Sequence, residues 1–593
     1  MTLEASLEQL ESSQIIRRLV AASAVAETDL GTAYRFKHTL TQDAAYRSLP
    51  RRQREAIHRR VAQCYEELFA TRLDEYAAVL AFHYDAGRED EKALAYSLRA
   101  GEAALKVYAT AEAGQHLDRA LRVVERGGSA TTEQLVQLCG RRGWGMELES
   151  RFEDAMESYR IVERLALDRS DRVLELAAVV AQTKLRSFIN PLYDPAAGKL
   201  LAERALALAE TQGDRRSEAE IYWNLMNQAR FDIGRLEEAV VFGKRALEIA
   251  RAIGWKEQVA FILNDIADVY GDLGMLEQGA AGLLEAGALW RELGKQNMLA
   301  DSLTNTGLWR SLLGDFAGAV AADSEAYEIS LRIQNVWGQA YSRGTRGLPH
   351  WHLGNYGAAI ADFEAGAALA DEAGFLIGQL LPRIELAILY NELGAAHLGL
   401  ALTEHVYRMV GEQVPGFASF VLSARAFFQL VAGDKAEAER YFEQAEPPDP
   451  AHGVFSFQFT SSVRILEARH GGRFEEALAL GERHLDAMRK YGVHTFATDV
   501  MLVNAQMLLQ LGREDEARTQ LQTARTMATS IGQRRMLWQI LPLLADLTAD
   551  PTEAAAMRSE AAAIMADIRD QLPTEELRAS FLALSDVRRI LIQ

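Results

Sequence analysis

The chain has 593 residues, of which 64 are Lys or Arg and 83 are Asp or Glu, so its formal net charge at pH 7 is −19. A surface with this charge repels polyanions on average, which argues against a general nucleic-acid binder. Only 12 prolines interrupt a composition rich in Ala, Leu, Glu and Arg, and this composition predicts an all-α protein.

The N-terminal residues MTLEASLEQLESS are acidic and contain no apolar stretch typical of a secretory signal. No run in the chain approaches the roughly 18 to 20 apolar residues that cross a bilayer. The two cysteines, Cys64 and Cys139, have no second Cys or His at ligand spacing, so a disulfide framework and a zinc site have no support. We therefore expect a soluble, cytoplasmic protein with no membrane partner.

Residues 1–70 do not follow the sequence pattern of the rest of the chain, and they predict a small winged-helix-like module. A strand-like stretch, VAETDLGTAYRFKH, is followed by two helical stretches. Six arginines gather there: Arg47, Arg51, Arg52, Arg54, Arg59 and Arg60. They fit a DNA-reading helix, a basic patch toward another domain or partner, or a plain solvated helix face, and the interleaved Asp43 and Glu55 weaken the first of these.

Residues 71–570 contain a repeat whose period is set by turn glycines. Successive gaps of 40, 40, 40, 40, 39, 39 and 40 residues separate Gly234, Gly274, Gly314, Gly354, Gly394, Gly433, Gly472 and Gly512. Each glycine stands between two apolar-periodic helical segments, and a small residue follows five positions later, as Ala239 and Ala319 do. This pattern predicts helix pairs stacked into a right-handed superhelical solenoid, because each repeat buries its apolar face only against its neighbours.

Weaker copies of the repeat extend it in both directions. Upstream, Gly87 and Ala93 occupy the expected turn and packing positions, and the segment around Phe152 and Ala155 is similar. Downstream, a degenerate last pair precedes residues 571–593, which we expect to form a C-terminal helix or cap.

The first helix of each pair is expected to line a concave groove, so residues at one offset before each turn glycine face the same space. The polar candidates lie ten, six and two residues before the glycines: Asn224, Asn264 and Thr304; Gln228 and Asp268; Asp232, Asp272, His352 and Glu392. Stacked amides can pair with the backbone of an extended peptide, and the carboxylates favour Lys or Arg side chains. The alternative is that these side chains only bind water.

Glycine in the turn, small residues in the second helix and apolar residues before the turn resemble the tetratricopeptide family, whose usual unit is about 34 residues. The longer unit here adds roughly one turn to each helix at about 3.6 residues per turn. The runs RFKHTLTQDAAYRSL, PRRQREAIHRRVA and LPTEELRASFLALSDVRRIL resemble the C-terminal half of bacterial STAND-type signal-transduction ATPases, including those attached to class III adenylate or guanylate cyclases.

The resemblance implies a protein- or peptide-binding sensor, and it makes His38 the candidate to approach a nucleotide bound by another domain, the alternative being that His38 caps the next helix or packs locally. Arg51 and Arg52, from the basic patch, are candidate interdomain residues beside it. The chain itself has no G-x-x-x-x-G-K-[ST] loop and no recognisable cyclase aspartate pair. We found no catalytic motif and no cofactor motif, so we expect a binding protein rather than an enzyme. Two alternatives stay open: the C-terminal part of a cyclase or ATPase, and a winged-helix transcriptional regulator.

Overall fold

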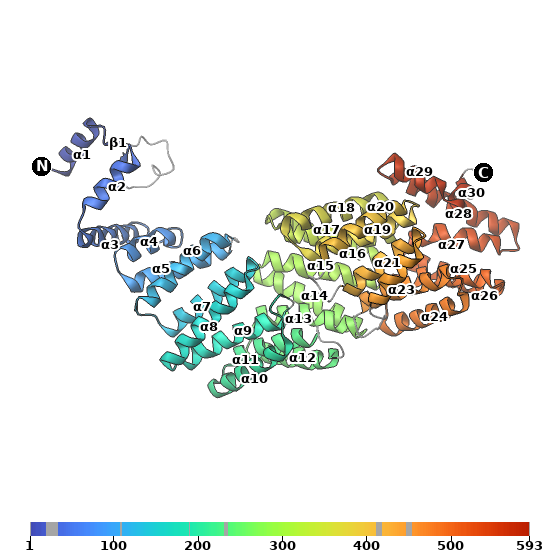
Figure 1. Ribbon diagram of the computed structural model, residues 1–593, viewed down its shortest axis with the longest axis horizontal. Helices are drawn as coiled ribbons and strands as arrows, with labels where there is room; N and C mark the ends of the chain where they lie inside the picture. The colour runs from blue at the N-terminus through green and yellow to red at the C-terminus, as the bar shows by residue number, and fades with distance from the viewer. Residues whose placement is uncertain are drawn as a thin grey trace. The chain divides into compact units, whose positions relative to one another are not determined.

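The computed structural model describes most of the chain, and it is all-α, as the composition predicts. The described residues are 2–18, 34–106, 109–188, 190–230, 235–410, 418–445 and 454–591. They form two compact units, Met1–Gly213 and Asp214–Gln593, which we call unit 1 and unit 2 (Figure 1). Within the described residues only two short strands occur, and both lie near the N-terminus.

Unit 1 opens with the module that the sequence predicts to be winged-helix-like. Its described elements are α1 (Leu3–Ser12), β1 (Ile16–Arg18), β2 (Tyr34–Phe36), α2 (Thr39–Ser48) and α3 (Arg51–Leu68). The two strands pair antiparallel, with Ile16 opposite Phe36. The first part of the strand-like stretch, residues 25–33, lies outside the described residues. Helix α2 buries none of its side chains, and Leu40 is 81% exposed, although the Tyr46 hydroxyl lies 2.9 Å from the His58 ring of α3.

The rest of unit 1 is built from antiparallel helices. They are α4 (Ala77–Ala86), α5 (Asp90–Lys106), α6 (Thr110–Glu125), α7 (Thr132–Leu148), α8 (Phe152–Arg169), α9 (Arg172–Ser187) and α10 (Pro195–Gln212). Capping residues in the local sequence determine where several of these helices begin. Thr131 and Gln134 form a capping box at α7, and Asp194 caps α10 just before Pro195. Ala93 and Ala155 are fully buried, as close helix packing requires.

Unit 2 consists of nine helix pairs and two terminal helices in its described residues. The pairs are α11 (Arg215–Arg230) with α12 (Leu236–Ala252), α13 (Lys256–Asp272) with α14 (Leu276–Leu293), α15 (Gln296–Leu312) with α16 (Phe316–Arg332), α17 (Val336–His352) with α18 (Tyr356–Ala373), α19 (Leu376–Glu392) with α20 (Ala396–Val410), α21 (Ala418–Val431) with α22 (Lys435–Gln444), α23 (Val454–His470) with α24 (Phe474–Tyr491), α25 (Ala497–Gln510) with α26 (Glu514–Ser530), and α27 (Arg534–Asp546) with α28 (Pro551–Gln571). Helices α29 (Glu575–Ala583) and α30 (Ser585–Leu591) follow them.

The eight predicted turn glycines lie between the first and second helices of the first eight pairs in unit 2, and the last pair, α27 with α28, has none. Seven of the eight are described, and all seven have a positive φ, between 72° and 88°. Gly234 lies outside the described residues. A second series, which the sequence analysis missed, closes the second helix of several pairs with a positive φ: Gly254, Gly294, Gly374, Gly492 and Gly532. Glycine suits these positions because a side chain would strain the left-handed backbone.

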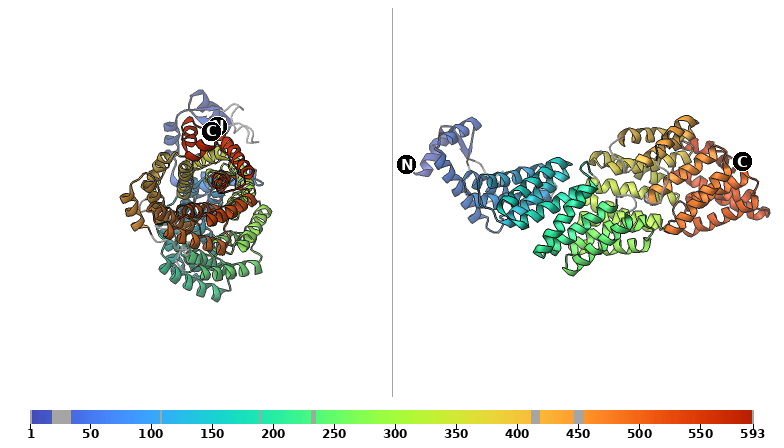
Figure 2. Two further views of the ribbon diagram at one scale, coloured as in Figure 1. Left: turned by 90° about the vertical axis from the view of Figure 1, so that its right-hand side faces the viewer. Right: turned by 60° about the horizontal axis from the view of Figure 1, so that its bottom comes forward.

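Helix pairs far apart in the sequence meet in unit 2 along a line of contacts that we call the seam. Gly274 lies against Tyr491, Gly314 against Ile531, and Gly354 accepts a hydrogen bond from Gln571. Each of these pairs is 217 residues apart, which is between five and six repeats. The array in unit 2 therefore curves until later pairs pack on earlier ones, and Figure 2 (left) shows its yellow, orange and red helices around a common centre.

Buried polar contacts reinforce the seam. The backbone N–H of His494 donates to the Leu312 carbonyl at 3.0 Å, and Gln533 lies 2.8 Å from the His352 ring. The Trp538 indole N–H donates to the Tyr356 hydroxyl at 3.2 Å. These groups need defined partners because burial without a hydrogen bond costs free energy, so they fix how the two turns of the array align.

Candidate functional site

A cavity of about 340 Å³ lies in unit 2 and is lined by the first helices of its pairs. Its walls come from α17, α19, α21, α23, α25 and α27, and no second helix contributes a lining residue. The volume lies in the range of small-ligand sites, at about 300 to 1,000 Å³.

Nine of the twenty cavity-lining residues keep a fixed register with the turn glycines. They recur nine residues before the glycine (Glu385, Val463, Val503), six before it (Ile388, Phe427, Leu466, Gln506), two before it (Glu392) and thirteen before it (Asp499). Residues spaced in this way share one face of an α-helix. We call these four positions, in the first helices of unit 2, the inner face.

Arg535 of α27 is the central charge of the cavity. Its Nε donates to Glu392 at 2.6 Å and its Nη2 to Asp499 at 2.7 Å, while its guanidinium lies 4.0 Å from the centre of the Trp351 ring. Glu392 also accepts from the Tyr356 hydroxyl. Arg535 is only 5% exposed, and the two carboxylates hold its pKa above the ordinary value despite burial. Arg535 therefore ties α27 to both α19 and α25.

Glu385 of α19 has no such partner. It is 7% exposed, and its Oε2 makes no hydrogen bond within the described structure. Burial raises the pKa of Glu385 to about 7, a shift that nearby Arg535 opposes and Asp499 increases. Near neutral pH this carboxyl is thus divided between its charged and neutral forms.

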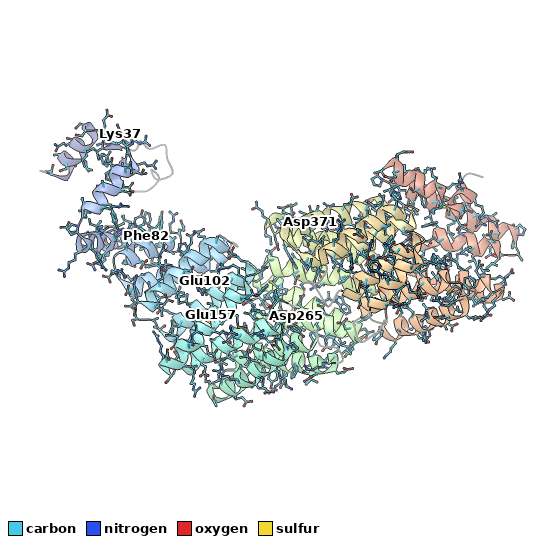
Figure 3. The ribbon with its side chains drawn as sticks, viewed as in Figure 1. Lys37, Phe82, Glu102, Glu157, Asp265 and Asp371 are labelled. Carbon is cyan, nitrogen blue, oxygen red and sulfur yellow. The ribbon has the colours of Figure 1, made fainter. Side chains whose placement is uncertain are left out.

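A second polar region lies on the inner face of α13 and α15. Asp265 accepts from the Trp223 indole N–H at 2.7 Å, and Asp301 accepts from the Asn264 amide at 3.2 Å (Figure 3 labels Asp265). Burial and the charge of Asp268 raise the pKa of Asp265 to about 6. Burial, with the charges of Asp265 and Asp268, raises the pKa of Asp301 to about 7.

The cations near this region do not balance its carboxylates. Arg230 pairs with Asp268 at 2.8 Å. The nearby Tyr341 is neutral, and its hydroxyl donates to Asn305 at 2.8 Å and not to one of the carboxylates. The inner face of α13 and α15 thus presents Asp265, Asp268 and Asp301 beside one described guanidinium, that of Arg230. Such a grouping attracts cations.

The predicted amide ladder lies one residue away from the inner face. Asn224 is fully buried, and neither of its amide atoms has a hydrogen-bond partner among the described residues. Asn264 is 6% exposed and donates to Asp301, while Thr304 is 1% exposed and bonds to the Ala300 carbonyl of its own helix. One residue turns a helix by about 100°, so Asn224, Asn264 and Thr304 point away from the inner face into the helix packing, whereas Ser462 and Leu502, also ten residues before a turn glycine, line the cavity. Their role in partner binding stays a prediction.

The other predicted groove residues have different environments. Glu392 lines the cavity, and Asp268 and Asp272 are half-buried on the inner face. Gln228 is buried in α11. His352 is fully buried in the seam, stacked on Phe316 at 4.8 Å. Asp232 lies outside the described residues. The sequence analysis missed Asp265, Asp301, Glu385, Asp499 and Arg535, although the first four occupy repeat positions nine or thirteen residues before a turn glycine.

The predicted interdomain residues lie on the surface of unit 1. His38 stands at the start of α2 without a side-chain cap bond and is exposed. Arg51 and Arg52 are exposed at the start of α3, and Arg51 pairs with Glu55 at 2.8 Å. Their role toward another domain stays a prediction.

Two searches of the described residues gave no site. No group of three or more His, Cys, Asp or Glu side chains is arranged to hold a metal ion there. None of the described helices is both long and apolar enough to span a bilayer.

Comparison with known proteins adds little to this description. No protein-family model matches the chain, and no curated protein matches its sequence. Among solved structures, the apo form of RapI aligns over 63% of this chain and 97% of its own, with 13% identity and a TM-score of 0.41. Yeast Tom70 aligns over 86% of this chain and 99% of its own, with 15% identity and a TM-score of 0.29. Similarities this low carry no conclusion about function.

Proposed function

We propose that this protein is a repeat scaffold that binds a Lys- or Arg-rich segment of a partner protein on the inner face of α13 and α15. The observation that carries the proposal is the excess of carboxylates there over the one guanidinium of Arg230. Mutual repulsion and burial raise the pKa of Asp265 and of Asp301, and a bound cation would relieve both effects.

Binding of a lysine- and arginine-rich peptide, measured by fluorescence anisotropy at pH 8, tests the proposal. We expect D265N/D301N to weaken binding by about tenfold or more, because a tenfold change corresponds to about 1.4 kcal/mol and two charge contacts are lost. An acidic peptide of the same length should not bind.

A matched control keeps the same change in net charge. Glu285 of α14 and Glu325 of α16 pair at 2.7 Å with Arg251 and Arg291, and both glutamates are about half exposed, away from the inner face. E285Q/E325Q should change peptide affinity by less than about twofold, since exposed pairs contribute little. Equal losses in the two double variants would mean that net charge alone, and not the inner face, attracts the peptide.

We further propose that the scaffold is the regulatory part of a signal-transduction ATPase or cyclase system and acts in the cytoplasm. This rests on the resemblance of residues 35–62 and 572–591 to STAND-type proteins. The exposure of Leu40 and Arg52 and the lack of buried side chains in α2 support it, because such a helix leaves a surface for another domain. The gene or its neighbours should encode a G-x-x-x-x-G-K-[ST] loop, and a locus without one would contradict this part of the proposal.

A further inference from the structure

We propose that the 340 Å³ cavity of unit 2 binds a small organic cation with an apolar body, which pairs with the Glu385 carboxylate. This site is separate from the inner face of α13 and α15, and the inference does not depend on the peptide-binding function. Two features of the cavity carry it: one carboxyl without a partner, and an apolar wall beside it.

Among the carboxylates that line the cavity, Glu385 alone has no ion pair within the described structure, while the cation of Arg469 bonds to a neutral amide and not to a carboxylate. Arg535 is shared by Glu392 and Asp499, and Arg469 donates to Gln506 at 2.8 Å. Glu385 is more than nine-tenths buried and its Oε2 has no described partner. A buried carboxylate without a counter-charge is costly, so a cationic ligand would supply the missing partner.

Unused hydrogen-bonding capacity lies next to Glu385. The Nη1 of Arg535 and the Oδ2 of Asp499 are both buried without a described hydrogen-bond partner. An ammonium group has three donors and can bond to Asp499 as well as to Glu385, while the Nη1 can donate to a ligand oxygen. Fixed polar groups of this kind set the orientation of a bound ligand.

Most of the remaining wall is apolar and belongs to several helices, with Asn391, Ser462, Gln506 and Gln539 as its neutral polar members. Ile388, Phe427, Val463, Leu466 and Val503 line it from α19, α21, α23 and α25. Burial of apolar ligand surface there contributes roughly 25 cal/mol per Å² removed from water. The cavity thus favours an amine with a hydrocarbon body over a small hydrated ion.

Binding of such a cation should depend on pH. The pKa of Glu385 is raised to about 7, and a bound cation favours the charged carboxylate, so affinity should rise as the pH increases from 6 to 8 while the amine stays protonated. The charged or titratable groups facing Glu385 from the surrounding helices are Tyr341 of α17, Glu392 of α19, Arg469 of α23, Asp499 of α25 and Arg535 of α27.

Calorimetric titration of the full chain with 4-phenylbutylamine at pH 8 tests the inference, with its N-acetyl derivative and 4-phenylbutyrate as neutral and anionic probes. We expect the amine to bind about tenfold or more tightly than either analogue, since only the amine can pair with Glu385. E385Q should remove most of this preference. V503F, which fills the cavity without changing its charge, should weaken the amine about tenfold as well.

Two controls separate this site from the peptide surface. E285Q and D265N/D301N should each leave amine affinity within about twofold, because neither touches the cavity. Repeating the amine titration with the protein saturated by the basic peptide identifies the source of the cation. Loss of amine binding would indicate that a lysine or arginine side chain of the peptide occupies the cavity, and unchanged amine binding would indicate that the natural ligand is a free amine. Either result supports the cation site. Equal binding of the amine and its acetylated form, equal binding to E385Q, or no binding of the amine would overturn the inference.

Discussion

Replacement of Gly274 by alanine adds a methyl group at the seam of unit 2. Gly274 has φ +72°, and a Cβ built on it would lie 2.9 Å from the Tyr491 Cα. The left-handed backbone costs a non-glycine residue about 1 to 2 kcal/mol. Contact with the backbone of α24 cannot be relieved by a rotamer change, and overpacking of this kind costs about 1 to 3 kcal/mol. We expect G274A to lose roughly 2 to 5 kcal/mol in all.

Gly512 supplies a closely matched control. It closes the same turn of a later pair with φ +74°, but a Cβ there would have no heavy atom within 4 Å. G512A should therefore lose only the backbone cost, about 1 to 2 kcal/mol. The difference between the two variants isolates the contact between turns of the array.

Urea unfolding at 25 °C, followed by circular dichroism and tryptophan fluorescence, measures this difference through the unfolding midpoints. The lower midpoint should belong to G274A. If both variants unfold within about 0.5 kcal/mol of each other, the seam does not pack as described, and the curvature assigned to unit 2 is wrong.

Three further predictions follow from the buried charges of unit 2. Affinity for the basic peptide should rise about three- to tenfold between pH 5.5 and pH 8, because the raised pKa values of Asp265 and Asp301 keep these carboxyls partly neutral at the lower pH. Anisotropy titrations that give the same affinity at both pH values would count against the role of these two residues. The pKa of folded Asp301, about 7, exceeds its ordinary value of 3.8, so this carboxyl reduces stability as pH rises through that window, and D301N should be more stable than the native chain by about 1 to 3 kcal/mol at pH 8 but not at pH 4. R535M should lose about 3 to 5 kcal/mol in urea unfolding, because Glu392 and Asp499 are left buried without their counter-charge, and a loss below 1 kcal/mol would show that they are hydrated.

The repeat could be predicted from the sequence because a local rule produces it. A turn that requires positive φ selects glycine, as at Gly314 and Gly354, and the 40-residue spacing then counts the pairs directly. The second glycine series, which includes Gly254 and Gly294, obeys the same rule and could have been found in the same way.

The binding face was harder to predict because tertiary packing decides how each first helix is rotated about its own axis, and hence which of its residues face inward. The period alone does not tell which side of each first helix faces inward, and positions ten and nine residues before the glycine differ by about 100° around the axis. Asn264 and Asp265 are adjacent in the sequence, yet the first is buried in helix packing and the second lies on the inner face.

The centre of the cavity has no local signature at all. Arg535 meets Glu392 across 143 residues, and the seam joins residues 217 apart. These contacts depend on how far the array curves with each repeat, which is the sum of many small packing angles. No motif in a single sequence records that sum.

Photocrosslinking tests most directly the claim that the inner face of α13 and α15 binds the partner. A benzoylphenylalanine replaces Leu308, six residues before Gly314 on the inner face of α15, or Leu284, which is 60% exposed on the second helix α14. After irradiation with the basic peptide, mass spectrometry should find the peptide attached at position 308 and not at position 284. Attachment at 284 alone, or equally at both positions, would contradict the account.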